Sequence, residues 1–248
     1  MVGKPDPVSM EVVKAFIALK PGFILTYFVA TICHLWHIIT MKFNELLRLI
    51  RDEVVFSSGF LQAGKADKAD ISRQLSRWTA EGKLIQLRRG LYMLASDHQH
   101  LAPHRFTIAN RIQKGSYVSL HSALAFHSLI PEHVPIVTSV TTARPRLLET
   151  EAGTYQFRHL HPKLFFGYQA GDPGDGSSAF LAFPEKALLD VIHLTPRSAD
   201  PAFLRELRLQ NLETLDMRRL HEFARRSRRK KWLRAADLVQ AMAAKEEE

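Results

Sequence analysis

The sequence contains one cysteine, Cys33, among its 248 residues. A single cysteine cannot form an intramolecular disulfide, and it excludes zinc sites built from several cysteines. This usage is typical of a reducing compartment, so we expect a cytoplasmic protein. Acidic residues are also few, because 25 Asp and Glu stand against 34 Lys and Arg, giving a net charge of +9. The excess of positive charge favours a polyanionic partner.

Long hydrophobic runs are scarce. The stretch at residues 23–39 has 17 residues and includes two histidines, which is the lower limit for a membrane span. No clear small-residue cleavage site follows it, which weakens a secretory interpretation. We expect residues 1–40 to be translated from an upstream start codon and absent from the natural protein, which then begins at Met41 without membrane contact. The alternatives are a membrane anchor and a docked hydrophobic helix.

The clearest pattern in the chain is an amphipathic helix at residues 70–82. Ile71, Leu75 and Trp78 recur at i, i+4 and i+7, so they share one helical face. Asp70 is suited to cap the start, and Gly82 to take the left-handed position at the end. The sides and opposite face carry hydrogen-bonding side chains: Arg73, Gln74, Ser76 and Arg77.

The flanking segments complete a winged helix-turn-helix. Residues 43–54 predict a first helix, and residues 57–63 a short second one, joined to the third by a turn at 64–68. Residues 83–94 predict two apolar strands joined through Arg88, Arg89 and Gly90. Helix, helix, helix and basic hairpin in this order form one module of about fifty residues.

Such a module binds DNA because a helix fits the major groove, where Ser, Arg and Gln reach base edges, while wing arginines meet phosphates. The alternative is a protein-interaction module with an ordinary solvated face. We predict that Arg73, Ser76 and Arg77 make the leading base or phosphate contacts, and that Arg88 and Arg89 hold the wing on the DNA backbone. The full predicted DNA-binding set is Lys68, Ser72, Arg73, Ser76, Arg77, Arg88 and Arg89.

A second basic region lies near the C-terminus. Residues 218–234 hold nine Lys and Arg residues and one acidic residue. A charge run of this kind is either a solvated helix face or a surface for phosphate or an acidic partner. The predicted basic patch is Arg225, Arg226, Arg228, Arg229, Lys230 and Lys231. Helices are expected at 218–223 and 232–243.

Between these basic regions the sequence predicts a mixed α/β domain. After a linker at 96–103, helices are expected at 106–112, at 119–126 with Ser119 as cap, and at 184–192. Residues 117–118, 134–142, 154–160, 164–168 and 179–183 predict strands. Residues 203–215 predict a helix and a turn.

Four segments have some features of phosphate-binding, metal-binding or catalytic motifs, but each lacks a residue or spacing that the motif requires or has a simpler explanation. The glycine-rich loop at 171–178 lacks the lysine and following Ser or Thr of a P-loop. His98, His100 and His104 have no further ligands at usable spacing, so we expect a solvated loop and no metal site. Ser122 lacks the glycine-flanked elbow of a hydrolase, which favours packing. Glu185, Lys186 and Asp190 suggest a nuclease-like site, but helix-start chemistry accounts for them without catalysis.

From Met41 onward the chain resembles the AbiEi family of type IV toxin-antitoxin and phage-defence systems. The resemblance rests on four segments: 87–92, 117–124 with His127 and 129–131, 165–167, and 183–190. The residues that carry the motifs are Tyr117, Ser119, Ser122, His127, Pro184, Glu185, Lys186 and Asp190.

The resemblance implies a winged helix that binds double-stranded operator DNA and represses its own operon. It also implies a second domain that counteracts a nucleotidyltransferase-type toxin, without a stable complex between the two proteins. The family also includes solitary regulators, so a toxin partner does not follow from the sequence.

We therefore predict an α+β protein: an N-terminal winged helix-turn-helix at 41–96, then a mixed α/β C-terminal domain at 97–248 with a helical, basic C-terminus. The predicted function is that of a non-enzymatic transcriptional regulator and antitoxin with no cofactor. The alternatives are a solitary DNA-binding regulator and a nucleic-acid-processing enzyme.

Overall fold

The computed structural model describes residues 41–50, 53, 55–61, 68–99, 102–174, 176–198 and 200–246. The predictions for residues 1–40, for the turn at 64–67 and for His100 lie outside these residues. Among the helices described, none is both long and apolar enough to cross a lipid bilayer.

The N-terminal part has the element order of a winged helix. Its elements are α3 (Phe43–Leu49), β1 (Phe56–Ser57), α4 (Ser58–Leu61), α5 (Lys68–Ala80), β2 (Leu84–Arg88) and β3 (Leu91–Leu94). The three strands form an antiparallel sheet in the order β1-β3-β2. The predicted first helix was too long, because α3 ends at Leu49, and strand β1 was not predicted.

Apolar periodicity explains how this part is held together. Leu46 and Ile50 from the first helical segment pack with Ile71, Leu75 and Trp78 of α5 in one buried cluster. The ring of Phe43 contacts Trp78 edge-on, with centroids 5.4 Å apart. These contacts fix the rotation of α5 about its axis, and hence which of its side chains face solvent.

The second part is built on a six-stranded mixed sheet in the order β6-β7-β5-β4-β9-β8. The strands are β4 (Ser116–Val118), β5 (Val137–Thr141), β6 (Arg146–Thr150), β7 (Gly153–His159), β8 (Tyr168–Gly171) and β9 (Ala179–Ala182). The pairs β4–β9 and β5–β7 are parallel, and the other pairs are antiparallel. The mixed α+β character predicted from the sequence is thus observed.

Two strand predictions need correction. Residues 164–168 do not form a strand: a 3₁₀ turn, η2 (Pro162–Leu164), comes first, and Gly167 adopts φ +75° before β8 begins at Tyr168. Strand β6 was missed. It lies at one edge of the sheet and is largely exposed, so it lacks the alternation of apolar and polar residues that marks a half-buried strand.

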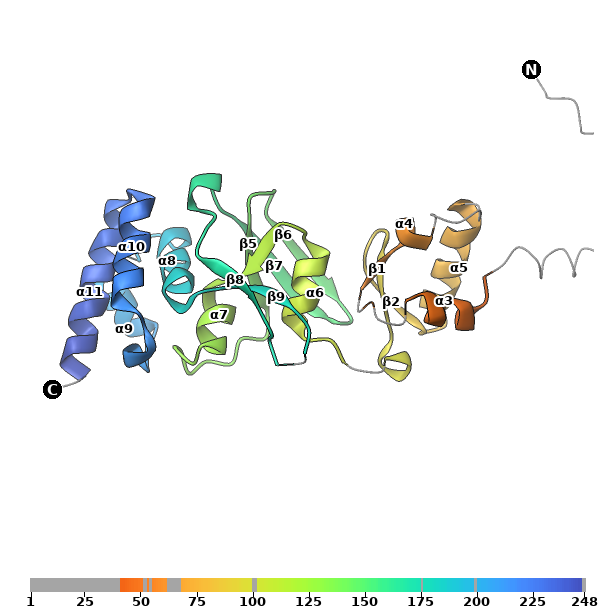
Figure 1. Ribbon diagram of the computed structural model, residues 1–248, viewed down its shortest axis with the longest axis horizontal. Helices are drawn as coiled ribbons and strands as arrows, with labels where there is room; N and C mark the ends of the chain where they lie inside the picture. Colours follow the sequence, from red (N-terminus) through yellow and green to blue (C-terminus); the bar gives the residue numbers. More distant parts are fainter. Residues whose placement is uncertain are drawn as a thin grey trace, which may run out of the picture.

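Helices cover both faces of this sheet (Figure 1). Helix α6 (Arg105–Ile112) lies on the face toward the winged helix, while α7 (Leu120–Phe126) and α8 (Pro184–Leu194) lie on the other. Beyond them come α9 (Pro201–Glu206), η3 (Leu212–Thr214), α10 (Met217–Ser227) and α11 (Lys230–Glu246). The winged helix and the pair α10–α11 therefore occupy opposite ends of the long axis.

The C-terminal helices are longer than the sequence predicted. Helix α10 continues to Ser227 and α11 already begins at Lys230, so the basic run at 224–231 is the corner between two helices rather than a separate segment. Arg228 makes the turn in the left-handed conformation, with φ 55°.

Candidate nucleic-acid interface

Helix α5 presents one buried and one exposed face. Ile71, Leu75 and Trp78 are at most 3% exposed, as the helical spacing predicts. Ser72, Arg73, Ser76 and Arg77 are all exposed, and their spacing of one and four residues aligns them along the solvent side. The two arginine side chains are 73% and 58% exposed, which leaves them accessible to a ligand.

We had predicted Gln74 on the polar side of this helix with Arg73, Ser76 and Arg77, but it is buried. It is 6% exposed and lies against the backbone of Met41. In the amide orientation that matches donors with acceptors, its nitrogen donates to the Met41 carbonyl (3.0 Å) and its oxygen accepts from the Met41 N–H (3.2 Å). Gln74 thus joins α5 to the residues before α3, and it is not available to read a base.

The start of α5 differs from the prediction, whereas its end has the predicted cause. The helix starts at Lys68, so Asp70 lies inside its first turn, where it pairs with Arg73, and it is not the cap. Gly82 adopts φ +70°. The N–H groups of Gly82 and Lys83 donate to the carbonyls of Thr79 and Trp78, which is the hydrogen-bond pattern of a Schellman end.

The exposed arginines of α5 are held by weak partners. Arg73 pairs with Asp70, and Arg77 Nε lies 3.6 Å from Glu81 Oε1. Lys83 Nζ also donates to Glu81 (2.7 Å), and this hydrogen bond is the main reason that the pKa of Glu81 is lowered. Ion pairs in such solvated positions contribute little stability. A phosphate or a guanine edge can therefore replace the carboxylates as the arginines' partner.

The two wing arginines have different environments. Arg88 is half-buried, and its Nε donates to the Ile112 carbonyl at the end of α6 (3.0 Å). It therefore joins the end of β2 to the end of α6, whereas we had predicted that Arg88 contacts the DNA backbone. Arg89 is exposed at the β2–β3 turn, beside Gly90 with φ +74°. Of the two arginines, Arg89 is therefore the one that is accessible to a phosphate.

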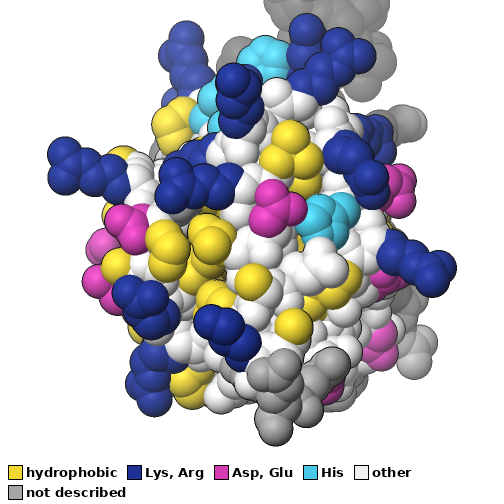
Figure 2. Space-filling model, turned by 90° about the vertical axis from the view of Figure 1, so that its left-hand side faces the viewer, with side chains coloured by type: hydrophobic (Ala, Val, Ile, Leu, Met, Phe, Trp, Pro, Cys, Tyr) yellow, Lys and Arg dark blue, Asp and Glu magenta, His cyan; other side chains and the backbone are white. Residues whose placement is uncertain are grey.

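The opposite end of the molecule carries the predicted basic patch. Figure 2 views this end directly and shows Lys and Arg side chains outnumbering Asp and Glu. Arg225, Arg226, Arg228, Arg229 and Lys230 are exposed. Lys231 differs from them, because its Nζ donates to the Thr195 carbonyl (2.7 Å) and burial lowers its pKa.

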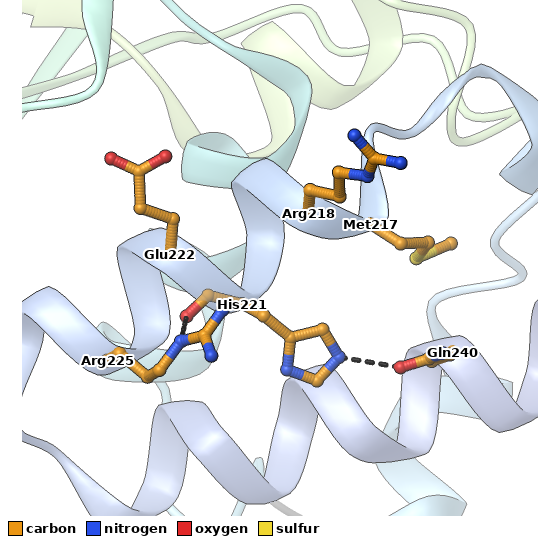
Figure 3. A pocket seen from close by; sticks show the side chains of 6 residues that line it. All are labelled: Met217, Arg218, His221, Glu222, Arg225 and Gln240. Atoms are coloured by element: carbon orange, nitrogen blue, oxygen red, sulfur yellow. Dashed lines mark hydrogen bonds between the residues drawn. The ribbon is translucent and has the colours of Figure 1, made fainter.

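A shallow groove runs beside this patch between α10 and α11 (Figure 3). His221 points from α10 toward α11, where its Nε2 lies 2.7 Å from Gln240 Oε1. Arg225 Nε donates to the His221 carbonyl (3.3 Å), which anchors that arginine along its own helix. The groove is thus tied together by polar contacts, and its walls carry Arg218, Arg225 and Glu222.

The motif residues of the second domain meet in a buried network. Lys186 and Asp190, one turn apart on α8, form an ion pair whose side chains are 0% exposed. Lys186 Nζ donates to the Tyr117 hydroxyl (2.8 Å), which in turn donates to Asp190 Oδ2 (3.0 Å). Ser119 Oγ donates to the same oxygen (2.8 Å). Ser119 therefore precedes α7 as predicted, but its side chain binds Asp190 instead of capping the helix.

Aromatic rings enclose this ion pair. Lys186 Nζ lies 5.4, 5.6 and 5.3 Å from the ring centroids of Tyr117, Phe166 and Trp232. Burial lowers the pKa of Lys186, an effect that the adjacent Asp190 opposes, and burial raises the pKa of Tyr117. A Cβ on Gly167 would approach Lys186 Cγ to 3.0 Å. The motifs at 165–167 and 183–190 are therefore halves of one packed unit.

The remaining motif residues also make structural contacts. Ser122 Oγ donates to the Ile136 carbonyl (3.0 Å) and accepts from the Thr138 N–H (2.8 Å), which joins α7 to β5. His127 Nε2 lies 2.9 Å from the Ala182 carbonyl, and burial lowers its pKa. Pro184 is in the first turn of α8.

Glu185 shows that helix-start chemistry was an incomplete explanation of this motif. It is 1% exposed and accepts from the Asp216 N–H (2.8 Å), while Arg219 lies 3.6 Å from its other oxygen. The carboxylates of Glu185 and Asp190 thus already bind groups of this protein and are closed to solvent. The geometry does not favour catalysis at this motif.

The two described histidines of the predicted linker contact nearby aromatic or backbone groups. His98 packs against Phe43 with centroids 4.9 Å apart, and the His104 side chain accepts a hydrogen bond from the Phe106 N–H at the start of α6. Both side chains therefore have structural contacts that need no metal ion.

Comparison with known protein families identifies a match in the N-terminal part of the chain. Residues 44–95 match the model of a family described as a transcriptional regulator, AbiEi antitoxin. The match spans α3 to β3, and therefore includes the exposed face of α5 and the wing. The match confirms the resemblance over these residues. No curated protein matches the chain significantly.

Proposed function

We propose that this protein is a cytoplasmic transcriptional repressor of its own operon, and that its second domain acts as the antitoxin against a nucleotidyltransferase-type toxin encoded alongside. The observation that carries the first half is the face of α5, where Ser72, Arg73, Ser76 and Arg77 are exposed in a row within the family-matched region. Lys68 at the start of α5 and Arg89 at the wing flank this row and supply phosphate contacts.

The mechanism follows from the geometry of α5. Its buried face fixes the helix on the α3 scaffold, so the exposed row enters the major groove as a rigid unit. Arg73 and Arg77 exchange their carboxylate partners for guanine edges or phosphates, while Ser72 and Ser76 donate to nearby acceptors. Arg88, bound to Ile112, sets the direction in which the wing points.

The antitoxin half rests on the resemblance of the second-domain motifs. Their residues build a buried scaffold around Lys186 and Asp190. Such a scaffold supports a surface that acts on a partner, and the resemblance implies an effect on the toxin without a stable complex. The runner-up is a solitary regulator with no toxin, which the same α5 surface would serve equally well.

The test of the repressor half is binding to duplex DNA from the region upstream of its own gene, against a scrambled duplex, titrated across salt. Replacing Arg73 and Arg77 together by alanine should lower specific affinity by about 30-fold or more, because two bidentate base contacts are lost and each discriminates by about 1–3 kcal/mol. Arg144→Ala, an exposed arginine of the second domain, is the matched control. Equal binding to both duplexes by the unaltered protein would refute sequence-specific repression.

The test of the antitoxin half is growth rescue when the protein is co-expressed with the product of the adjacent gene. The Arg73→Ala, Arg77→Ala variant should still rescue growth, since it leaves the second domain intact. Rescue by neither protein would leave the solitary regulator as the better description.

A further inference from the structure

The corner between α10 and α11 gathers exposed positively charged side chains that form no ion pair with a carboxylate of the described residues. These side chains are Arg225, Arg226, Arg228, Arg229 and Lys230. The corner is also well ordered by packing, because the Arg226 guanidinium stacks 4.1 Å from the Phe166 ring centroid and Lys231 is held by Thr195.

Helix chemistry accounts for only some of these charges. Arg225 and Arg226 lie in the last turn of α10, where the partial negative charge of the helix end favours cations. Arg229 and Lys230 instead lie at the first turn of α11, where the partial positive charge disfavours them and where no acidic residue offsets it. Exposure to solvent alone does not explain why cations lie at the start of α11. A bound polyanion would explain it, because the side chains and the helix end would both attract it.

The side chains around the corner indicate which polyanion fits. Arginines bind phosphate through two parallel hydrogen bonds, and the corner is rich in arginine. Single-stranded nucleic acid is bound largely by stacking bases on exposed aromatic rings. The aromatic residues packed beneath the corner, Phe166, Phe223 and Trp232, are at most 7% exposed. A backbone surface for a duplex therefore fits better than a platform for single strands.

We propose that the α10–α11 corner is a second, sequence-independent binding surface for the phosphate backbone of duplex DNA. It lies at the end of the molecule opposite α5 (Figure 1). One chain can then hold two duplex segments, one read by α5 and one held by the corner. This goes beyond operator recognition and does not depend on it.

The test uses the full chain carrying Arg73→Ala and Arg77→Ala, so that α5 contributes little, and a scrambled duplex as the probe. Adding Arg229→Gln and Lys230→Gln should lower the salt dependence of binding, the slope of log K against log salt concentration, by about 2, since each phosphate contact contributes about 0.9. Arg144→Gln with Arg146→Gln removes the same charge from two exposed positions, one in the β5–β6 connection and one at the start of β6, and should leave the slope unchanged. The charge-preserving pair Arg229→Lys with Lys230→Arg should retain binding.

The same variants separate this proposal from a solvated face. Arg229→Gln with Lys230→Gln should keep or raise the melting temperature while weakening DNA binding, because the substitutions remove cations from a positive helix end. With α5 intact, donor- and acceptor-labelled duplexes should be brought together by the unaltered protein and not by the corner variant. An unchanged salt slope, or a preference for single-stranded DNA or for RNA, would overturn the proposal whether or not α5 reads an operator.

Discussion

At the scale of single residues, Lys186 shows which contacts can be predicted from spacing along a helix and which cannot. The spacing of Lys186 and Asp190 predicts a pair on one helix, and the pair exists. The sequence could not indicate that it would be completely buried, because its other partner, Tyr117, lies 69 residues away on β4. Gln74 is a similar case: helical periodicity placed it on the polar side, but its hydrogen bonds to the Met41 backbone allow it to be buried.

We expect Lys186→Met to destabilise the fold by about 3–5 kcal/mol, because it leaves the Asp190 carboxylate buried without its cation. Adding Asp190→Asn should recover part of this loss, since the buried charge is removed while Tyr117 and Ser119 keep an acceptor. Urea unfolding of the two variants measures both values. A double variant that is less stable than the single one would contradict a charge-pairing role for Lys186.

At the scale of elements, the prediction was best where local chemistry decides the structure. The buried stripe of α5, its end at Gly82 and the wing hairpin all follow from short-range patterns. The prediction was least accurate where contacts with distant parts of the chain decide the local structure. The apolar run at 164–168 is interrupted by η2 and by Gly167, which is tightly packed against Lys186, and the edge strand β6 has no buried face to mark it.

Two glycines of the winged helix provide a matched test of helix boundaries. Gly82→Ala should destabilise the protein by about 1 kcal/mol, because φ +70° is unfavourable for alanine although its Cβ would meet no atom within 4 Å. Gly59→Ala, inside α4, should be neutral or stabilise by about 0.5–1 kcal/mol, since its Cβ would make an ordinary contact 3.7 Å from Ser57 Oγ. The two free energies of unfolding should differ in this direction, and equal values would rule out backbone strain at Gly82 as the end signal of α5.

At the scale of the whole molecule, the predicted boundary at residues 96–97 does not separate two hydrophobic cores. Leu87, Leu91 and Met93 of the wing pack in one cluster with residues of α6 and of the six-stranded sheet. Arg88 and the ion pair between Arg111 and Glu53, at 3.7 Å, cross the same boundary. The polar composition of residues 96–103 predicts a linker and gives no sign of this contact, because the two sides meet through apolar residues that are far apart in the sequence.

A shared core should make the winged helix and the second domain unfold together. We expect Leu91→Ala to remove about 2–5 kcal/mol of stability, and the loss should appear equally in the hydrogen-exchange protection of peptides from α5 and from α8. Leu147→Ala, which truncates a leucine that is 55% exposed on β6, is the control and should leave both unchanged. If α5 alone loses protection, the two parts are independent. If both lose it, the two parts unfold as one cooperative unit.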